Sequence, residues 1–297
     1  MATTTPGMDR LSLNTATTKA LTLAEALAAA SAAGLTRVGL WRDRVEEVGL
    51  AAAVDLVHAS GLAVSTLCRG GFLTAADTAG QAHALADNRV AIEQAAALGA
   101  PELVLVVGGL PDGDVDLAAA RARVADRLVD LVPYAREHGV RLALEPLHPM
   151  YVADRAVLST LGQALDLAAP YSPAEVGVCV DTFHVFWDPQ LAEQVARAGQ
   201  EQRIAAYQVC DFNLPIAADA LLSRGMMGDG VVDFDAVTRL VAATGYDGPV
   251  EVEIFNADIW AAPADRVLST MKQRFADLVL PALASSGSAT DPAARGR

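Results

Sequence analysis

Positive charge is scarce in this sequence of 297 residues. Lysine and arginine together number 22 against 36 aspartates and glutamates, which gives a formal net charge of −14. A protein of this charge repels phosphate backbones and anionic lipid headgroups. The composition therefore argues against a nucleic acid or a membrane as a partner.

Cysteines are few, and long apolar runs are absent. The three cysteines, Cys68, Cys179 and Cys210, lack CxxC spacing and lie inside strand-like runs, which predicts buried thiols and neither a disulfide framework nor a zinc cluster. No stretch approaches the ~18 apolar residues of a membrane helix, and the first ten residues show no secretion signal, so we expect a cytoplasmic protein. Without a GxGxxG or Walker sequence, a nucleotide cofactor has no support.

Short apolar runs alternate with longer amphipathic segments along most of the chain. One such segment places apolar residues at Leu117, Ala120, Val124, Leu128 and Leu131, the spacing of a helix with one buried face. A β-then-α rhythm repeated eight times predicts a single (β/α)8 TIM barrel over residues 1–284. The expected strands are 10–14, 37–41, 63–68, 102–107, 140–145, 176–181, 205–210 and 249–254.

Small and polar residues dominate the last segment, SSGSATDPAARGR, and predict a disordered tail over 285–297.

Glycines recur just before the expected strands, as at Gly61 and Gly99. At such positions a glycine can end the preceding helix in the left-handed conformation at little steric cost, which supports the predicted repeat of helices and strands.

A polar residue closes a short apolar run at or near the end of four of the expected strands: Glu145, Asp181, Gln208 and Glu253. Because side chains alternate faces along a strand, the apolar neighbours of these residues face the helices and the four polar side chains face the barrel axis. They should therefore converge at the C-terminal mouth, where the active sites of such barrels lie. Glu251 shares the inward parity of Glu253, which lies nearer the mouth.

Three carboxylates and an amide oxygen are ligands suited to a hard divalent cation. A single carboxylate at a strand end is more often a helix cap or a surface charge. Four on separate strands favour a metal site, because clustered carboxylates without a counter-charge repel one another and are costly to desolvate.

The motifs EPLHP, VDTFH, QVCD, MGDGVVDF and GYDGPVEVEIF resemble those of the sugar isomerase and epimerase family with the xylose-isomerase-like barrel, from about Leu11 to Phe275. The resemblance implies one Mn²⁺ or Mg²⁺ ion held by Glu145, Asp181, Gln208 and Glu253. It also implies a sugar or keto-sugar substrate from which a proton next to a metal-polarised carbonyl is removed. On this reading Glu145 and Glu253 are the catalytic proton-transfer pair.

Two positions depart from the ketose epimerases of that family. Gln208 stands where they carry histidine, and Leu214 stands where they carry arginine. The run EPLHPMY together with Gln208 also resembles the catalytic subunit of the C-glycoside deglycosidases. That resemblance implies an alternative function, a 3-keto-glycoside β-elimination lyase with His148 as its base.

Several other residues near strand ends are candidates for binding the sugar. His148 and His184 each follow a proposed ligand by three residues, and an imidazole there can act on a bound sugar. The remaining histidines, His58, His83 and His138, lie on helical segments and are read as structural. The other candidates for substrate contact are Arg69, Trp41, Arg224, Phe183 and Trp187.

A small sugar is the expected partner, with a homo-oligomer possible, or a small β-rich subunit on the lyase reading. A DNA-repair endonuclease of the same barrel type would need a basic groove and a histidine-rich zinc cluster, which this acidic chain lacks. A non-catalytic sugar-binding protein would not require three converging carboxylates. The sequence thus favours a metal-dependent enzyme.

Overall fold

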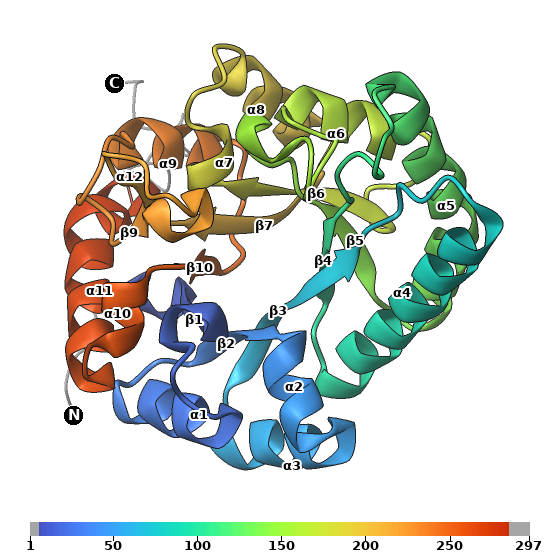
Figure 1. Cartoon of the computed structure of the whole chain (residues 1–297). Coiled ribbons are helices and arrows are strands. Elements are labelled where there is room, and N and C mark those ends of the chain that lie inside the picture. The colour runs from blue at the N-terminus through green and yellow to red at the C-terminus, as the bar shows by residue number, and fades with distance from the viewer. Residues whose placement is uncertain (1–5, 285–297) are drawn as a thin grey trace, which may run out of the picture.

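A closed barrel of parallel strands forms the centre of the molecule (Figure 1). The computed structural model describes residues 6–284. Around the barrel the strands follow the order β1, β10, β7, β6, β5, β4, β3, β2, which confirms the predicted TIM barrel. The strands are β1 Leu11–Asn14, β2 Arg37–Trp41, β3 Ala63–Gly71, β4 Glu102–Val106, β5 Arg141–Leu144, β6 Val176–Asp181, β7 Ile204–Val209 and β10 Val250–Val252.

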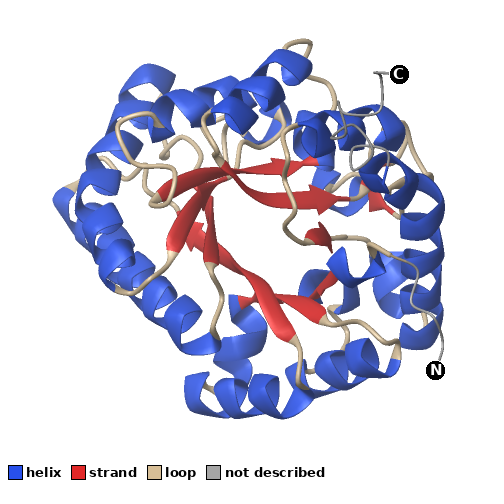
Figure 2. Ribbon diagram, turned by 180° about the vertical axis from the view of Figure 1, so that it is seen from behind, coloured by secondary structure: helices blue, strands red, loops and turns tan. Residues whose placement is uncertain are grey.

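Helices surround the barrel as an outer ring, which Figure 2 shows from the opposite side. The predicted tail, residues 285–297, lies outside the described residues. Among residues 6–284, no helix is both long and apolar enough to cross a membrane. The helices are α1 Leu23–Ala32, α2 Arg42–Val48, α3 Leu50–Ser60, α4 Thr78–Leu98, α5 Leu117–Glu137, α6 Leu161–Ala168, α7 Thr182–Val185, α8 Leu191–Gln200, α9 Phe234–Ala243, α10 Ala257–Ala261, α11 Ala264–Leu278 and α12 Leu280–Ala284.

Helix α5 shows how the local sequence sets an element. Asp116 caps its N-terminus, because the Asp116 side chain accepts a hydrogen bond from the Ala119 N–H at 3.0 Å. Four residues of the predicted stripe, Ala120, Val124, Leu128 and Leu131, are fully buried, whereas Leu117 at the start of the helix is partly buried. Helices α3 and α4 end at Gly61 and Gly99, both at a φ of 70°, as the sequence predicts.

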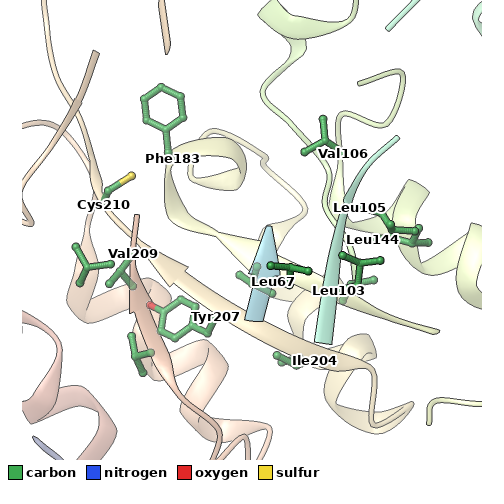
Figure 3. Packing of buried hydrophobic residues seen from close by; sticks show 14 of the residues in the cluster. Leu67, Leu103, Leu105, Val106, Leu144, Phe183, Ile204, Tyr207, Val209 and Cys210 are labelled. Atoms are coloured by element: carbon green, nitrogen blue, oxygen red, sulfur yellow. The ribbon is translucent and has the colours of Figure 1, made fainter. Parts of the chain in front are cut away.

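Most of the core lies between the strands and the helices. Leu67, Leu103 and Leu142 pair across β3, β4 and β5 and are fully buried in this outer core, part of which Figure 3 shows. Their chain neighbours Cys68, Val104 and Ala143 belong to a small separate inner cluster. The two-residue alternation expected of the strands is therefore present, and all three cysteines are buried and free.

One element of the fold was not predicted. β8 (Asp211–Phe212) and β9 (Arg224–Gly225) pair as a two-stranded antiparallel sheet outside the barrel order. This sheet brings two ends of the loop after β7 together, with Phe212 opposite Arg224. It places Arg224, far from any barrel strand in the sequence, at the functional site described next.

Candidate functional site

Three carboxylates lie together at the C-terminal end of the barrel: Glu145, Asp181 and Glu253, here called the carboxylate cluster. Glu145 directly follows β5, Asp181 ends β6, and Glu253 directly follows β10. All three are at most 5% exposed. Each therefore needs a counter-charge or a proton to be stable in this environment.

Arg224 supplies part of that counter-charge. Its Nη1 donates to Asp181 Oδ2 at 3.0 Å and to Glu253 Oε2 at 2.9 Å. The guanidinium lies 4.7 Å from the ring centroid of Phe183 and 5.1 Å from that of Phe255, and cation–π interactions with both rings stabilise its charge. The Asn256 side chain donates to the Arg224 carbonyl at 2.9 Å and holds the backbone. Arg224 is thus a positioned part of the cluster.

His184, on the short helix α7 that follows β6, lies beside the carboxylate cluster. Its Nε2 lies 4.0 Å from Glu145 Oε1 and 3.8 Å from Asp181 Oδ2. Burial, and then the charge of Arg224, lower the pKa of His184 well below its usual value, so the ring is neutral. Its Nδ1 faces the backbone N–H of His148 at 3.2 Å and its Nε2 faces Arg224 Nη2 at 2.9 Å. A neutral imidazole has a single acceptor nitrogen, so only one of these two contacts is a hydrogen bond.

The carboxylates of the cluster have unlike surroundings. Oε1 of Glu145 is buried without a hydrogen-bond partner among residues 6–284, and burial, with the nearby charge of Glu253, raises the pKa of Glu145 well above its usual value. Burial also raises the pKa of Asp181 to about 6, although Arg224 opposes the shift. Glu253 accepts from Trp41 Nε1 at 2.8 Å in addition to Arg224. Glu145 is therefore the least satisfied of the three.

The cluster fits a divalent cation held by oxygen. Ligand atoms of Glu145, Asp181 and His184 all lie within 4.8 Å of one another. The single lone pair of His184 already faces two donors, which leaves the carboxylates as the better ligands. Three carboxylates against the one guanidinium of Arg224 leave a deficit of positive charge, and each carboxylate oxygen can accept more than one partner. The unpartnered Oε1 of Glu145 is the open ligand position that such an ion needs.

Gln208 lies one layer deeper, where it contacts Glu251. Its Nε2 donates to Glu251 Oε1 at 2.9 Å, and its Oε1 accepts from the Cys179 thiol at 3.5 Å. Asn14 donates to the same Glu251 oxygen at 2.7 Å, and Ser65 and Thr66 also donate to this carboxyl group. Both ends of the Gln208 amide are therefore engaged below the cluster, and its role as a metal ligand stays a prediction.

A cavity of about 150 Å³ opens beside the cluster. Glu145, Glu253, His184 and Arg224 all contribute to its wall, so a small molecule in it would touch the charged groups directly. The remaining lining residues are Lys19, Trp41, Arg69, Val106, Leu147, Arg155, Leu221 and Phe255.

A second cavity, of about 240 Å³, lies beneath Glu251 and is lined by Glu102 and Arg141 among others. These two residues begin β4 and β5, so this cavity belongs to the N-terminal end of the barrel. Active sites of TIM barrels form at the opposite end. We therefore place the functional site at the smaller cavity, with the carboxylate cluster.

The residues expected to contact substrate divide into two groups. Trp41, Arg69, His184 and Arg224 line the cavity. Phe183, Trp187 and His148 are not among its lining residues. The Phe183 ring is fully buried against Arg224, and the Trp187 indole donates to the His184 carbonyl at 2.8 Å. The His148 imidazole stacks with the rings of Phe186 and Phe212.

Two cations that line the cavity, Arg155 and Lys19, were not predicted. Both lie in βα loops of a strongly acidic chain: Arg155 ten residues after Glu145, and Lys19 five residues after the end of β1. Their one recognisable feature in the sequence is a basic residue in a loop that follows a strand, at the C-terminal end of the barrel where the active site forms. Loop geometry, which the sequence does not reveal, decides whether such a residue reaches the cavity.

Comparison with known proteins places the barrel among related sequences. The profile of the family described as xylose isomerase-like TIM barrel matches residues 27–274. An inosose isomerase from Halalkalibacterium halodurans is 22% identical over 223 residues, which cover 75% of this chain and 76% of that protein. A ketose 3-epimerase from Arthrobacter globiformis is 30% identical over 168 residues, which cover 54% of this chain and about half, 48%, of the epimerase.

Solved structures show the same fold. A crystal structure of a protein from Sinorhizobium meliloti 1021 is 47% identical, with a TM-score of 0.88, and the match covers 92% of this chain and 99% of that one. A crystal structure of IolI with a bound zinc atom is 22% identical, with a TM-score of 0.80, over 91% of this chain and 98% of that one. At this identity the second match supports the fold alone.

Proposed function

The chain belongs to the xylose isomerase-like TIM barrel family, and from this premise we propose that it is a divalent-metal-dependent isomerase or epimerase acting on a sugar or keto-sugar. The observation that carries the proposal is the carboxylate cluster, buried beside a cavity and holding a single guanidinium. Two relatives support it, since one is named an inosose isomerase and the other a ketose 3-epimerase.

We assign the ion to Glu145, Asp181 and Glu253, with Mn²⁺ or Mg²⁺ favoured because the ligands are hard oxygens. The amide of Gln208 is a further proposed ligand, provided that it turns from Glu251. When bound, such an ion supplies a Lewis acid that polarises a carbonyl oxygen.

Glu145 and Glu253 are the proposed proton-transfer pair. Both line the cavity, but their surroundings differ: Glu145 is buried with an unpartnered oxygen, whereas Glu253 accepts from Trp41 and Arg224. Burial raises the pKa of Glu145, so it holds a proton more readily than an exposed glutamate. Two carboxyl groups in unlike environments suit opposite roles as proton donor and acceptor. His184 and Arg224, on the same wall, can orient the substrate oxygens.

The alternative lyase reading has less support. It requires His148 as a base, yet the His148 ring lies 5.6 Å from the ring centroid of Phe212 and is not among the lining residues of the cavity. Its Nδ1 also accepts from the Met150 N–H at 3.3 Å. We therefore rank isomerisation or epimerisation first.

Removing divalent ions should abolish turnover reversibly. A panel of ketoses and 3-keto-glucosides would be assayed with protein treated with EDTA, then with added Mn²⁺ or Mg²⁺. We expect turnover of at least one ketose, loss of that turnover in EDTA and recovery with either ion. Turnover that survives EDTA in protein shown to be free of metal would contradict the proposal, and release of an aglycone from a 3-keto-glucoside would favour the lyase.

Metal affinity should fall as the pH falls. Burial raises the pKa of Asp181 to about 6 and that of Glu145 well above its usual value, so both carboxyl groups take up protons that compete with a cation. Lowering the pH from about 7.5 to 5.5 should weaken Mn²⁺ binding by roughly tenfold or more. Calorimetry in buffers of different ionisation enthalpy would also count the protons released. An affinity that does not change over this range would contradict the ligand assignment.

A further inference from the structure

Two arginines in the cavity wall, Arg69 and Arg155, are less well neutralised than their neighbour Arg42. Within residues 6–284, the guanidinium of Arg69 stacks on the Phe72 ring at 4.2 Å and has no carboxylate within salt-bridge distance. Nε of Arg155 makes no hydrogen bond within the described residues, and its ion pair, with Asp154 Oδ2 at 3.5 Å, is to a carboxylate that is 62% exposed. Both arginines line the cavity that contains Glu145.

Arg42, the neighbour of Arg69, shows what a satisfied arginine looks like in this region. It binds both oxygens of Asp87, at 3.0 and 2.9 Å. Arg69 has no such partner. Burial lowers its pKa, and the charges of Arg155 and Arg42 lower it further, so Arg69 and Arg155 repel each other. In a chain with a net charge of −14, two mutually repelling arginines in one cavity are unexpected unless an anion binds there, because Arg69 has no ion pair among the described residues and Arg155 has only a mostly exposed aspartate.

The backbone holds Arg155 in place. Gly108, just beyond β4, donates to the Arg155 carbonyl at 2.9 Å, and Val157 donates back to the Gly108 carbonyl at 2.9 Å. The loop after β5 is thereby tied to the end of β4. The Tyr151 ring packs at 5.6 Å from the guanidinium. The fold therefore fixes the backbone of Arg155, and the Tyr151 ring supports its side chain.

The carboxylate cluster does not account for these two charges. Arg224 donates to Asp181 and Glu253 directly, and the proposed divalent ion would supply the rest of the positive charge there. We propose that Arg69 and Arg155 form a subsite for an anionic group of the substrate, a carboxylate or a phosphate, while its carbonyl end faces the carboxylate cluster. The substrate would then be an acidic or phosphorylated keto-sugar, an inference that rests on the proposed function.

Binding measurements with matched probes test the subsite. Calorimetry of Mn²⁺-loaded protein at constant ionic strength would compare D-fructose, D-fructuronate and D-fructose 6-phosphate. We expect at least one anion to bind about tenfold or more tightly than the neutral ketose, the effect of one hydrogen bond to a charged group. Whether the uronate or the phosphate gains more identifies the anionic group.

Two variants test the arginines of the subsite, and a third is their control. Arg69→Met and Arg155→Met, which keep most of the side-chain bulk, should each remove most of the preference for the anion. Arg136→Met removes an arginine of α5 whose side chain is 61% exposed and paired with Glu175, and should leave the preference unchanged. Equal binding of neutral and anionic probes, no binding of either anion, or a preference that survives both cavity variants would overturn the subsite.

The outcome can be separated from that of the proposed reaction, because binding is read without turnover. A preference for the anion in a protein that exchanges no substrate proton would retain the subsite and reject the reaction. Exchange with a neutral ketose and no such preference would retain the reaction and reject the subsite.

Discussion

Asp181→Asn should yield a folded protein that retains no divalent ion and shows no turnover. Asparagine keeps an oxygen that can accept from the Phe183 N–H, as Asp181 Oδ1 does at 2.8 Å, so the cap of α7 should survive. It loses the negative charge that a cation needs. Metal affinity should fall by more than the roughly 10–100-fold that follows loss of a residue that only supports a ligand. Metal content after dialysis and circular dichroism would measure the two outcomes.

The matched control is Asp233→Asn. Asp233 caps α9 by accepting from the Ala236 N–H at 3.0 Å and lies away from the cluster, so the same chemical change should leave the metal content normal. Stoichiometric metal in dialysed Asp181→Asn would show that this carboxylate is not a ligand.

Glu253→Gln should slow substrate turnover by a general-base factor of about 10²–10⁴ in kcat. Glutamine keeps the acceptor oxygen for Trp41 but cannot take up a proton from carbon. Because Glu253 is also a proposed ligand, kcat would be measured at saturating Mn²⁺, so that weaker metal binding is separated from lost proton transfer.

Two controls bracket this prediction. Glu251→Gln changes the same residue type two positions earlier on β10, where Asn14 and Gln208 can still donate to the new amide oxygen, and should retain most activity. His148→Ala should cost only the modest factor of a positioning group. If His148→Ala instead lowers kcat by about 10²–10⁴-fold while Glu253→Gln stays active, the protein is better described as a lyase with His148 as its base than as an isomerase or epimerase.

Much of the barrel and its carboxylates could be predicted from local pattern. Asp181 ends β6, and Glu145 and Glu253 follow β5 and β10 by one residue. The alternation of inward and outward side chains predicts that all three face the barrel axis. Parallel strands carry such residues to one end of the barrel whatever lies between them in sequence. The period of apolar residues along a strand and the face to which each side chain points depend only on nearby residues, so both can be predicted from the sequence.

The rest of the site depends on contacts between segments distant in sequence. Arg224 reaches Asp181 because β9 pairs with β8, and Arg155 reaches the cavity because its loop bonds to Gly108. Parity places Gln208 inside the barrel but does not say which partner its amide chooses, and Glu251 is the one it contacts. Phe183 was expected to contact substrate, yet its ring is fully buried against Arg224. Hydrophobic pattern alone does not distinguish a wall of the site from the layer behind it.

Deuterium uptake from solvent tests the central claim most directly. The ketose that the protein converts would be turned over in D₂O with Mn²⁺, and carbon-bound deuterium followed by NMR and mass spectrometry. If a proton next to the carbonyl passes between carbon and Glu145 or Glu253, deuterium should appear at that carbon in product and recovered substrate, and should be absent in metal-free protein. Full conversion in D₂O without deuterium at any carbon would indicate a hydride shift and would contradict the acid and base roles assigned to both glutamates.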